Sequence, residues 1–411
     1  MQIIPAKRIQ VSENRLRRDI EALAAIGAGP FGITRRAYTT EDTKARRLTV
    51  SLMEDAGLRV RVDPVGNVFG RRDGRDPEKP VIMAGSHIDT VPNGGMFDGA
   101  LGVLGAIEAI RTFNDAGIVT ESPMEIAAFA DEEGAWFSGT FGSRAFVGQV
   151  REQELRATTR DGQSVWEKLK SAGLSPDDLA GSVASYPISA YLELHIEQGG
   201  VLERDGLDIG VVTGIVGITR GAITAVGMAN HAGTTPMHMR DDALVKAARF
   251  ICLVHEEARR GCDMVATIGQ IQVSPGAVNV VPGETRLSLE MRSMDPARIE
   301  TAVERFKQGA ASLGGIEVDL GLAKMPVPMD PGVMDSIEDA CKDAGYPYKR
   351  MASGAGHDAM CLARIASVGM IFVPSMGGIS HSSKECTAWD QAARGVDVLA
   401  RTILRLDARK L

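Results

Sequence analysis

The stretch Pro80-Val81-Ile82-Met83-Ala84-Gly85 is a short apolar run that ends at glycine, which is typical of a buried β-strand. Residues 99–117 are expected to form a helix, and residues 124–130 a second buried strand. A strand, a helix and a strand at this spacing predict a crossover unit in an α/β sheet. Functional residues collect just beyond the carboxyl ends of such strands, so the segments that follow both strands are the first candidates for a site.

The elements around this unit predict two different patterns of secondary structure along the chain. Helices and short strands precede it, at 12–26, 40–57, 58–62 and 68–70. The next region predicts strands and helices with hairpin-like joins, at 218–226, 240–260, 264–273, 284–291 and 296–313. A helix over 334–344 and an apolar strand over 368–373 then return to the first pattern, of helices and buried strands.

We therefore predict an α/β protein of two domains. A catalytic α/β domain is formed by two chain segments, 1–212 and 325–411, and a smaller α+β domain is inserted between them at 213–324. A length of 411 residues agrees with two domains of ~100–200 residues each. The sequence shows no internal repeat and no low-complexity segment.

Composition and charge exclude several classes of protein. A hydrophobic fraction of 44% is too high for a disordered or fibrous chain. A formal net charge of -7 argues against nucleic acid or an anionic membrane as the main partner. Because no run of ~18 apolar residues occurs, no membrane span is expected.

The cysteines and the N-terminus bear on the compartment. The five cysteines include no CxxC pair, so a disulfide framework or a cysteine zinc site is not expected, and a reducing cytoplasm fits. The segment Met1–Arg8 is not followed by a long apolar run, so no signal peptide is expected. We therefore expect a cytoplasmic protein. The sequence positions of the cysteines are Cys252, Cys262, Cys341, Cys361 and Cys386.

Acidic and histidine side chains follow the two predicted strands. On an extended segment alternate side chains point the same way, so Asp89 is placed to hold the far ring nitrogen of His87. Asp98 lies in a glycine-rich turn before a helix, where it is either an ordinary helix cap or a carboxylate between two cations. In Asp131-Glu132-Glu133 neighbouring side chains point apart, so one glutamate can bind metal while the other holds a water; a solvated acidic loop is the alternative.

Two further histidines complete the set of candidate ligands. His195 lies on an alternating strand, on one face with Glu193 and Glu197, although a lone histidine there is more often a core residue. His381 is flanked by glycines beyond the predicted strand at 368–373, and glycines allow a backbone to approach a site closely. Three histidines and three or more carboxylates match the ligand demands of a two-zinc-type site.

Together these segments resemble the amidase, hydantoinase and carbamoylase branch of the M20 metallopeptidase family, over essentially the whole chain and in the same order. The resemblance implies two divalent metal ions per subunit, Zn or else Mn, Co or Ni, with Asp98 as the bridging ligand. It also implies that Glu132 is the general base and that Asp89 orients His87. The implied ligands are His87, Asp98, Glu133, His195 and His381.

The resemblance also implies substrate contacts. His231, in the segment 229–237, matches a histidine that stabilises the developing oxyanion, often in the partner subunit's active site. Asn279 and Arg292 match positions that hold a substrate carboxylate, although Arg292 at a strand end fits a surface ion pair equally well. Gln198 and Gly356 match further contacts, and beside Gly356 the alternative for His357-Asp358 is a structural hydrogen-bonded pair.

The family resemblance finally implies an architecture and a reaction. The insert would act as a dimerisation and lid domain of a homodimer, and hinge closure would bring its residues to the metals. A histidine at 195, where peptidase branches generally have a carboxylate, favours hydrolysis of an N-carbamoyl-L-amino acid to amino acid, ammonia and carbon dioxide.

Alternative functions stay open at this point. Allantoate, ureidoglycolate-type compounds and N-carbamoyl-β-alanine (a ureidopropionase) are the closest alternative substrates. An aminoacylase or dipeptidase is less favoured because of His195 and Gln198. A non-catalytic binding protein would be expected to lack the base or a ligand, and the sequence has both.

Overall fold

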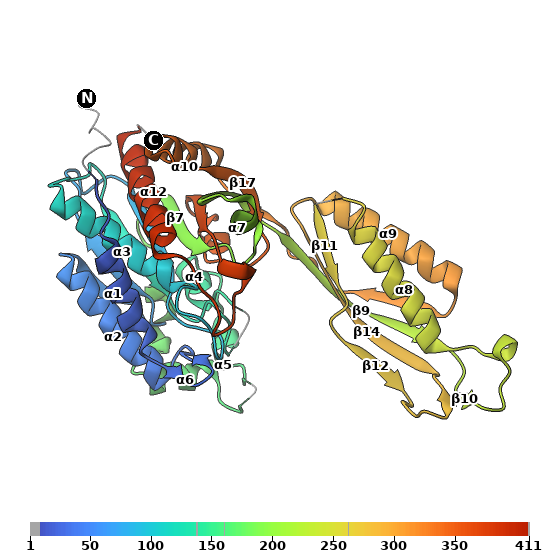
Figure 1. Ribbon diagram of the computed structural model, residues 1–411. Helices are drawn as coiled ribbons and strands as arrows, with labels where there is room; N and C mark the ends of the chain where they lie inside the picture. The colour runs from blue at the N-terminus through green and yellow to red at the C-terminus, as the bar shows by residue number, and fades with distance from the viewer. Residues whose placement is uncertain (1–8, 137–138, 160, 262, 410–411) are drawn as a thin grey trace. The chain divides into compact units, whose positions relative to one another are not determined.

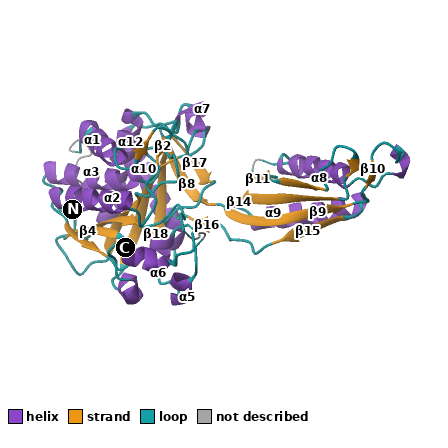
Figure 2. Ribbon diagram, turned by 90° about the horizontal axis from the view of Figure 1, so that it is seen from below, coloured by secondary structure: helices purple, strands orange, loops and turns teal. Residues whose placement is uncertain are grey.

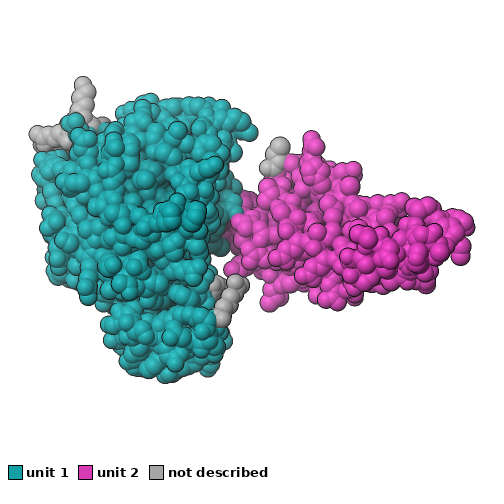
Figure 3. Space-filling model, turned by 60° about the horizontal axis from the view of Figure 1, so that its bottom comes forward, with its two compact units in different colours: residues 1–213, 329–411 teal, residues 214–328 magenta. Residues whose placement is uncertain are grey.

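The computed structural model of the protein describes residues 9–136, 139–159, 161–261 and 263–409. The chain forms two compact units, which Figure 3 shows in different colours. Unit 1 comprises Met1–Thr213 and Met329–Leu411, and unit 2 comprises Gly214–Pro328. Each unit has its own sheet and its own hydrophobic core, so each is described by itself.

Unit 1 is built on a mixed sheet in the order β8-β18-β7-β5-β6-β4-β3, with β17 paired to β8. The strands β5, β6, β7 and β18 are parallel to their neighbours in that group, and β3, β4 and β8 run antiparallel to theirs. The strand bounds are β3 Arg59–Val62, β4 Val68–Arg72, β5 Val81–His87, β6 Met124–Phe129, β7 Ile188–Ile196, β8 Ile209–Ile215, β17 Tyr348–Ser353 and β18 Ser367–Val373. The two-residue strand β16, Val327–Pro328, belongs to unit 2 and pairs with Gly214 and Ile215 at the end of β8.

The central strands are apolar because helices cover them (Figure 1). Every residue of β5 is buried, as expected for a parallel strand that is covered on both faces. Helix α3 packs on β5 and β7, and α12 packs on β18, β7 and α3. A methyl group added at Gly102 of α3 would lie 2.4 Å from the carbonyl oxygen of Leu194, so this glycine lets α3 approach β7 closely.

The remaining helices of unit 1 lie along the flanks of this core (Figure 2). Helix α1 packs against α3 and α12, α10 packs against α12 and β18, and α2 packs against β3 and β4. The helix bounds in unit 1 are α1 Glu13–Ala24, α2 Thr40–Asp55, α3 Ala100–Asp115, α4 Phe141–Phe146, α5 Glu152–Arg156, α6 Val165–Ser171, η2 Pro176–Ser182, α7 Val201–Asp205, α10 Pro331–Ala344, α11 Ala359–Leu362, η4 Met376–Gly378 and α12 Trp389–Ala408.

Unit 2 is an antiparallel sheet with two helices. The strand order is β11-β14-β9-β15, with β12 also paired to β14, and α8 and α9 pack on the sheet around a core that includes Phe250 and Phe306. The short pair β10 and β13 forms a separate ladder. The bounds are β9 Gly217–Val226, β10 Asn230–His231, η3 Met237–Met239, α8 Ala243–Ala258, β11 Met264–Thr267, β12 Ile271–Ser274, β13 Val280–Val281, β14 Glu284–Ser293, α9 Pro296–Leu313 and β15 Ile316–Leu320.

The predicted α/β class and the central strand-helix-strand unit are confirmed by β5, α3 and β6. The short helices between residues 141 and 182 and the long helix α12 were not predicted. In α12 the buried residues Val396, Leu399, Ile403 and Leu406 recur at three- and four-residue spacing, so a signal for this helix was present in the sequence.

Two other predictions concern membrane spans and the cysteines. No helix among the described residues is both long and apolar enough to cross a lipid bilayer. Cys252, Cys341, Cys361 and Cys386 are free thiols. Cys262 and the segment Met1–Arg8 lie outside the described residues.

Candidate metal centre

The parallel strands of unit 1 bring the predicted ligands to one edge of the sheet. His87 is the last residue of β5, Glu132 and Glu133 follow β6, and His195 is the next-to-last residue of β7. Because these three strands are adjacent and parallel, their carboxyl ends meet at the same edge. The loop before α3 adds Asp98, and the loop after β18 adds His381.

The five side chains form two donor groups that share one carboxylate. The buried group comprises His87, Asp98 and His195, and the loop group comprises Asp98, Glu133 and His381. Within each group the ligand atoms lie within 4.8 Å of one another.

The two oxygens of Asp98 face different groups. The Asp98 Oδ1 atom lies 3.1 Å from His195 Nε2 and 3.6 Å from His87 Nε2. The Asp98 Oδ2 atom lies 3.3 Å from His381 Nε2. One carboxylate is therefore placed to serve both groups, as a bridging ligand does, and histidine and carboxylate donors in this arrangement fit a divalent cation.

Asp98 is not a helix cap, which was its alternative interpretation. The N-cap residue of α3 is Gly99, and it makes no side-chain capping bond. Gly99 has φ of 65°, and a methyl group added there would lie 2.4 Å from the His87 ring. This glycine therefore leaves the space that the imidazole occupies beside Asp98.

Backbone carbonyls orient the two buried imidazoles. The Nδ1 atom of His87 lies 3.1 Å from the Asp89 carbonyl oxygen, and the Nδ1 atom of His195 lies 3.0 Å from the Ile196 carbonyl oxygen. In a neutral imidazole the nitrogen that faces a carbonyl carries the proton, which leaves Nε2 as the electron-pair donor. Both Nε2 atoms face Asp98 Oδ1.

The contact of Asp89 with His87 differs from the predicted one. The expected alternation fails because β5 ends at His87, and the closer contact to the ring comes from the Asp89 backbone. The Asp89 carboxylate lies 3.6 Å from His87 Nδ1 and instead accepts hydrogen bonds from the amides of Glu132 and Glu133, both at 3.2 Å. Asp89 thus joins the ends of β5 and β6.

Glu132 lies beside the buried group without belonging to it. Its Oε2 atom is 3.6 Å from His87 Nε2. Burial raises the pKa of Glu132 well above its ordinary value, against the opposing effect of His87. A carboxylate whose pKa is raised in this way is suited to accept and return a proton near neutral pH.

The charges around Asp98 shift one another's pKa values. Although burial acts to raise it, His195, His381 and His87 in their protonated forms hold the pKa of Asp98 well below its usual range. Burial and the nearby Asp98 raise the pKa of Glu133 to about 7, and the hydrogen bond to Asp98 raises the pKa of His381 to about 9. The site gathers carboxylates at a density that a divalent cation would compensate.

Gln198 contacts both the shared carboxylate and the loop group. It has φ of 58°, and its Nε2 atom donates to Asp98 Oδ2 at 2.9 Å and lies 3.3 Å from His381 Nε2. Its Oε1 atom is buried and has no hydrogen-bond partner among the described residues. Buried acceptors are rarely left unpaired, so this oxygen is available for a ligand donor.

Gly356 and the two residues that follow it differ in their exposure to solvent. Gly356 itself is exposed. The buried His357 packs edge-on against the His195 ring, with centroids 4.5 Å apart, and its Nε2 atom lies 2.8 Å from Ser353 Oγ. Asp358 accepts from Ser143 Oγ at 2.6 Å. His357 and Asp358 therefore bond to different partners, Ser353 and Ser143, and not to each other.

The three predicted substrate residues of unit 2 lie in two places. The exposed His231 and Asn279 are neighbours, because His231 pairs with Val280 and the Ala232 amide donates to the Asn279 carbonyl at 2.9 Å. Arg292 lies near the opposite end of β14, where it pairs with Glu290 at 2.7 Å. The eight residue steps from Glu284 to Arg292 span about 26 Å at ~3.3 Å per strand residue, so Arg292 lies far along β14 from the end that is nearest in sequence to Asn279.

Residues that the sequence analysis did not select also contact the centre. Glu385 is buried and accepts hydrogen bonds from the amides of Phe97 and Asp98. Ser380 donates toward Asp98 Oδ2 at 3.1 Å. A signal existed for both, since they flank His381 in a glycine- and serine-rich segment, but nothing in the sequence points their side chains toward Asp98.

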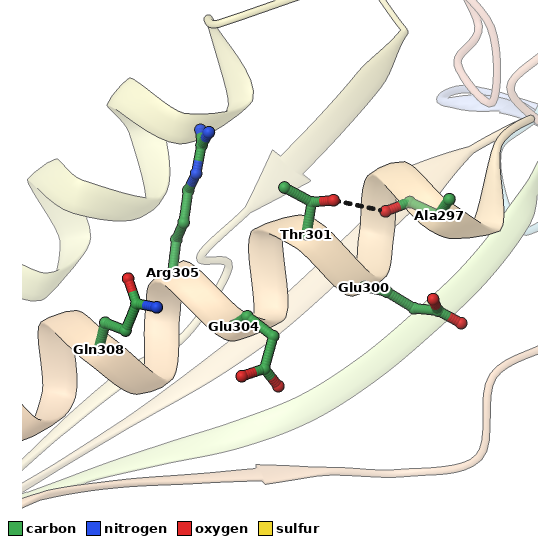
Figure 4. A pocket seen from close by; sticks show the side chains of 6 residues that line it. All are labelled: Ala297, Glu300, Thr301, Glu304, Arg305 and Gln308. Carbon is green, nitrogen blue, oxygen red and sulfur yellow. Dashed lines mark hydrogen bonds between the residues drawn. The ribbon is translucent and has the colours of Figure 1, made fainter.

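A hollow on the surface of unit 2 contains, among the described residues, no histidine and no group of converging ligand atoms like those of the metal centre. It is formed along α9 alone, and Figure 4 shows Arg305 and Glu304 pointing to different sides of the helix. Arg305 pairs with Glu257, and the Thr301 hydroxyl donates to the Ala297 carbonyl at 2.8 Å. The lining residues are Ala297, Glu300, Thr301, Glu304, Arg305 and Gln308.

Comparison with known proteins agrees with the geometry of unit 1. The sequence model described as peptidase family M20/M25/M40 matches residues 83–405. The chain is 41% identical over 406 residues to the N-carbamoyl-L-amino acid amidohydrolase of Geobacillus stearothermophilus, covering 96% of this chain and 99% of that protein. It is 40% identical over 402 residues to the enzyme of the same name from Paenarthrobacter aurescens, covering 96% and 98%.

A protein with another name and a solved structure also match over nearly the full length. The allantoate amidohydrolase of Escherichia coli K12 is 36% identical over 400 residues, covering 94% of this chain and 96% of that protein. The crystal structure of an amidase of the hydantoinase/carbamoylase family from Burkholderia multivorans superposes with a TM-score of 0.92 at 37% identity, covering 98% and 100% of the two chains.

Proposed function

The chain belongs to peptidase family M20/M25/M40 and is a hydrolase of C–N bonds, and from this premise we propose that it hydrolyses N-carbamoyl-L-amino acids. The observation that carries the proposal is the Asp98 carboxylate, whose two oxygens face two donor groups while Glu132 lies beside one of them. We propose that the groups hold two divalent metal ions, with zinc, manganese, cobalt or nickel as the candidates.

The ions would polarise the carbamoyl carbonyl and make a water molecule more acidic. Glu132 would take a proton from the attacking water and return it to the nitrogen that leaves. One C–N bond of the carbamoyl group breaks, and the carbamate that remains decomposes to carbon dioxide and the second amine. The products are therefore the amino acid, ammonia and carbon dioxide.

Gln198 would recognise the carbamoyl group. Its buried Oε1 atom lacks a partner among the described residues, and a carbamoyl group offers N–H donors at the position of the scissile bond. Its Nε2 atom is held by Asp98 Oδ2 at 2.9 Å, which fixes the orientation of the amide. The exposed Gly356 would lie along the same substrate.

Unit 2 would supply the contacts to the carboxylate and the oxyanion. Arg292 and Asn279 would bind the substrate carboxylate, for which the planar guanidinium is suited. The Nδ1 atom of His231 accepts from the amides of Gly233 and Thr234, at 3.0 and 3.3 Å, so the proton of the neutral ring is on Nε2. That N–H would be the oxyanion donor.

The separation of His231 and Asn279 from Arg292 within unit 2 supports a homodimer. Asn279 and its neighbour His231 are next in sequence or pairing to the Glu284 end of β14, and about 26 Å of strand separates that end from Arg292, more than one substrate of this class spans. We propose that His231 and Asn279 of one copy serve the metal centre of a second copy, while Arg292 serves its own. Unit 2 would then be both the dimerisation domain and the lid.

The substrate assignment is tested by ammonia release with metal-reconstituted protein. The panel contains N-carbamoyl-L-amino acids, their D-enantiomers, N-carbamoyl-β-alanine and allantoate. An N-acetyl amino acid is followed separately by release of the free amino acid, because its hydrolysis yields no ammonia. We expect the highest kcat/KM for an N-carbamoyl-L-amino acid. Activity on allantoate alone would replace this proposal with the second candidate, which the 36% identity to an allantoate amidohydrolase favours.

A further inference from the structure

His381 is more exposed to solvent than the other candidate ligands. Its side chain is 50% exposed, and its φ of 54° lies in the left-handed region that few non-glycine residues adopt. It belongs to the segment from Pro374 to Thr387, which we call the His381 loop. The ends of this loop are joined by bonds from Met376 N to the Cys386 carbonyl at 2.8 Å and from Thr387 Oγ1 to the Pro374 carbonyl at 3.0 Å.

Glu385 ties this loop to the segment that carries the shared carboxylate. It is only 5% exposed, and its Oε1 atom accepts from the backbone amides of Phe97 at 3.0 Å and Asp98 at 3.1 Å. Its Oε2 atom accepts from Ser380 Oγ at 3.0 Å. A single carboxylate therefore holds the backbone on which Asp98 stands and the residue that precedes His381.

The neighbouring residues are arranged around Glu385. Ser380 Oγ also lies 3.1 Å from Asp98 Oδ2, so the hydroxyl is shared between the two acids. A methyl group added at Gly95 would lie 2.3 Å from Glu385 Oε1 and 2.4 Å from its Cβ atom, so glycine is required for Glu385 to lie across this turn. The backbone at Gly95 and the side chain of Ser380 are thus both arranged to accommodate the Glu385 carboxylate.

We propose that Glu385 is a positioning residue that builds the loop group, by fixing the Asp98 backbone and the His381 loop relative to each other. The proposal rests on the proposed two-metal hydrolase and adds a residue through which one of the two ion sites is formed. The buried group shares Asp98 but depends on Glu385 less, since its other two ligands, His87 and His195, are held by β5, β7 and backbone carbonyls. Removing Glu385 should therefore weaken the ion site of the loop group more than that of the buried group.

The test is calorimetric titration of metal-free, full-length protein with Mn²⁺. The variants are Glu385→Ala, Glu385→Gln and Ser380→Ala, and the matched control is Ser382→Ala, a serine of the same loop without a contact to Asp98. Glutamine keeps an Oε1 acceptor for the two amides, so Glu385→Gln should restore most of what alanine removes. Thermal unfolding of each metal-free variant reports its fold.

For Glu385→Ala we expect the ion of the loop group to bind 10–100-fold more weakly, the usual range for residues that orient ligands, and the ion of the buried group to be weakened clearly less. Ser380→Ala should weaken the ion of the loop group to a smaller extent, and Ser382→Ala should change neither. If Glu385→Ala does not fold, the contrast between Ser380→Ala and Ser382→Ala takes its place.

Three outcomes would overturn the proposal: both ions bound with full affinity by folded Glu385→Ala, both weakened equally, or no difference between the two serine variants. These outcomes are separate from the failure of the proposed function. If the unaltered protein binds fewer than two ions, the two-metal proposal itself fails. If it binds two ions and releases no ammonia from any substrate, only the substrate assignment fails.

Discussion

The buried group and the loop group share Asp98, yet the chain builds them by different means. His87 and His195 stand at the ends of β5 and β7, are 2% and 1% exposed, and have their rings oriented by backbone carbonyls. Glu133 and His381 stand on loops, and the His381 side chain is 50% exposed. Regular structure fixes the first group, whereas side-chain bonds to distant backbone fix the second.

This difference indicates which ligands of the metal centre should tolerate substitutions in their surroundings. Ligands at the ends of buried strands cannot move without disturbing the sheet, because β5 and β7 are covered on both sides. Ligands on loops depend on a few hydrogen bonds, each of which contributes about 0.5–1.5 kcal/mol. We therefore expect the two groups to respond differently to substitution.

The largest expected effect concerns Glu132, which belongs to neither group. Glu132→Gln should lower kcat by 10²–10⁴-fold, the usual contribution of a general base, because the amide cannot take the proton from water. Both ions should remain bound, since the residue is outside both donor groups. Ammonia release and metal content are measured on the same sample, and unchanged turnover with full metal content would contradict the role of Glu132.

A matched pair of histidine variants tests the comparison directly. His195→Ala should abolish binding of one ion and lower the stability of the metal-free protein by about 1–3 kcal/mol, because the ring is buried against His357. His381→Ala should weaken the other ion and change that stability by less than about 0.5 kcal/mol, because the side chain is half exposed. Chemical unfolding and metal titration measure the two effects.

Equal losses of stability in the two histidine variants would break the distinction between the groups. A control is His255→Ala, on α8 of unit 2, which should leave metal binding unchanged.

The smallest expected effect concerns Gln198, which contacts Asp98 and His381 from outside both groups. Gln198→Ala should raise KM for an N-carbamoyl-L-amino acid by roughly 10-fold, because one hydrogen bond to the substrate is worth about 1 kcal/mol or slightly more. Metal content and unfolding should stay as they are. An effect on kcat alone, with KM unchanged, would argue against a role in substrate binding.

The same contrast explains which parts of the molecule could be predicted. The strands that carry His87, Glu132 and Glu133, and His195 have local signals, since short apolar runs mark buried strands and polar residues follow their ends. The pattern places the Asp89 carboxylate beside His87, and the two side chains lie 3.6 Å apart. The closer contact, from the Asp89 backbone carbonyl at 3.1 Å, could not be predicted because the pattern does not mark the end of β5 at His87.

The contacts of the loop group were beyond sequence reasoning. Glu385 and the amide of Phe97 are separated by 288 positions in the chain. No periodicity connects two loops at such a distance, and only the packing of the whole of unit 1 brings them together. The long helix α12 is a different case, because apolar residues at three- and four-residue spacing mark it in the sequence itself.

The distance between His231 and Arg292 along unit 2 has a genetic consequence. Under the proposed arrangement each active site draws these residues from two different chains. A gene copy that lacks His231 and another that lacks Arg292 would each encode an inactive enzyme, but mixed dimers would contain one intact site and one doubly damaged site. With random pairing of equal amounts, about one quarter of all sites would be intact, so two defective alleles would complement each other within a single cell.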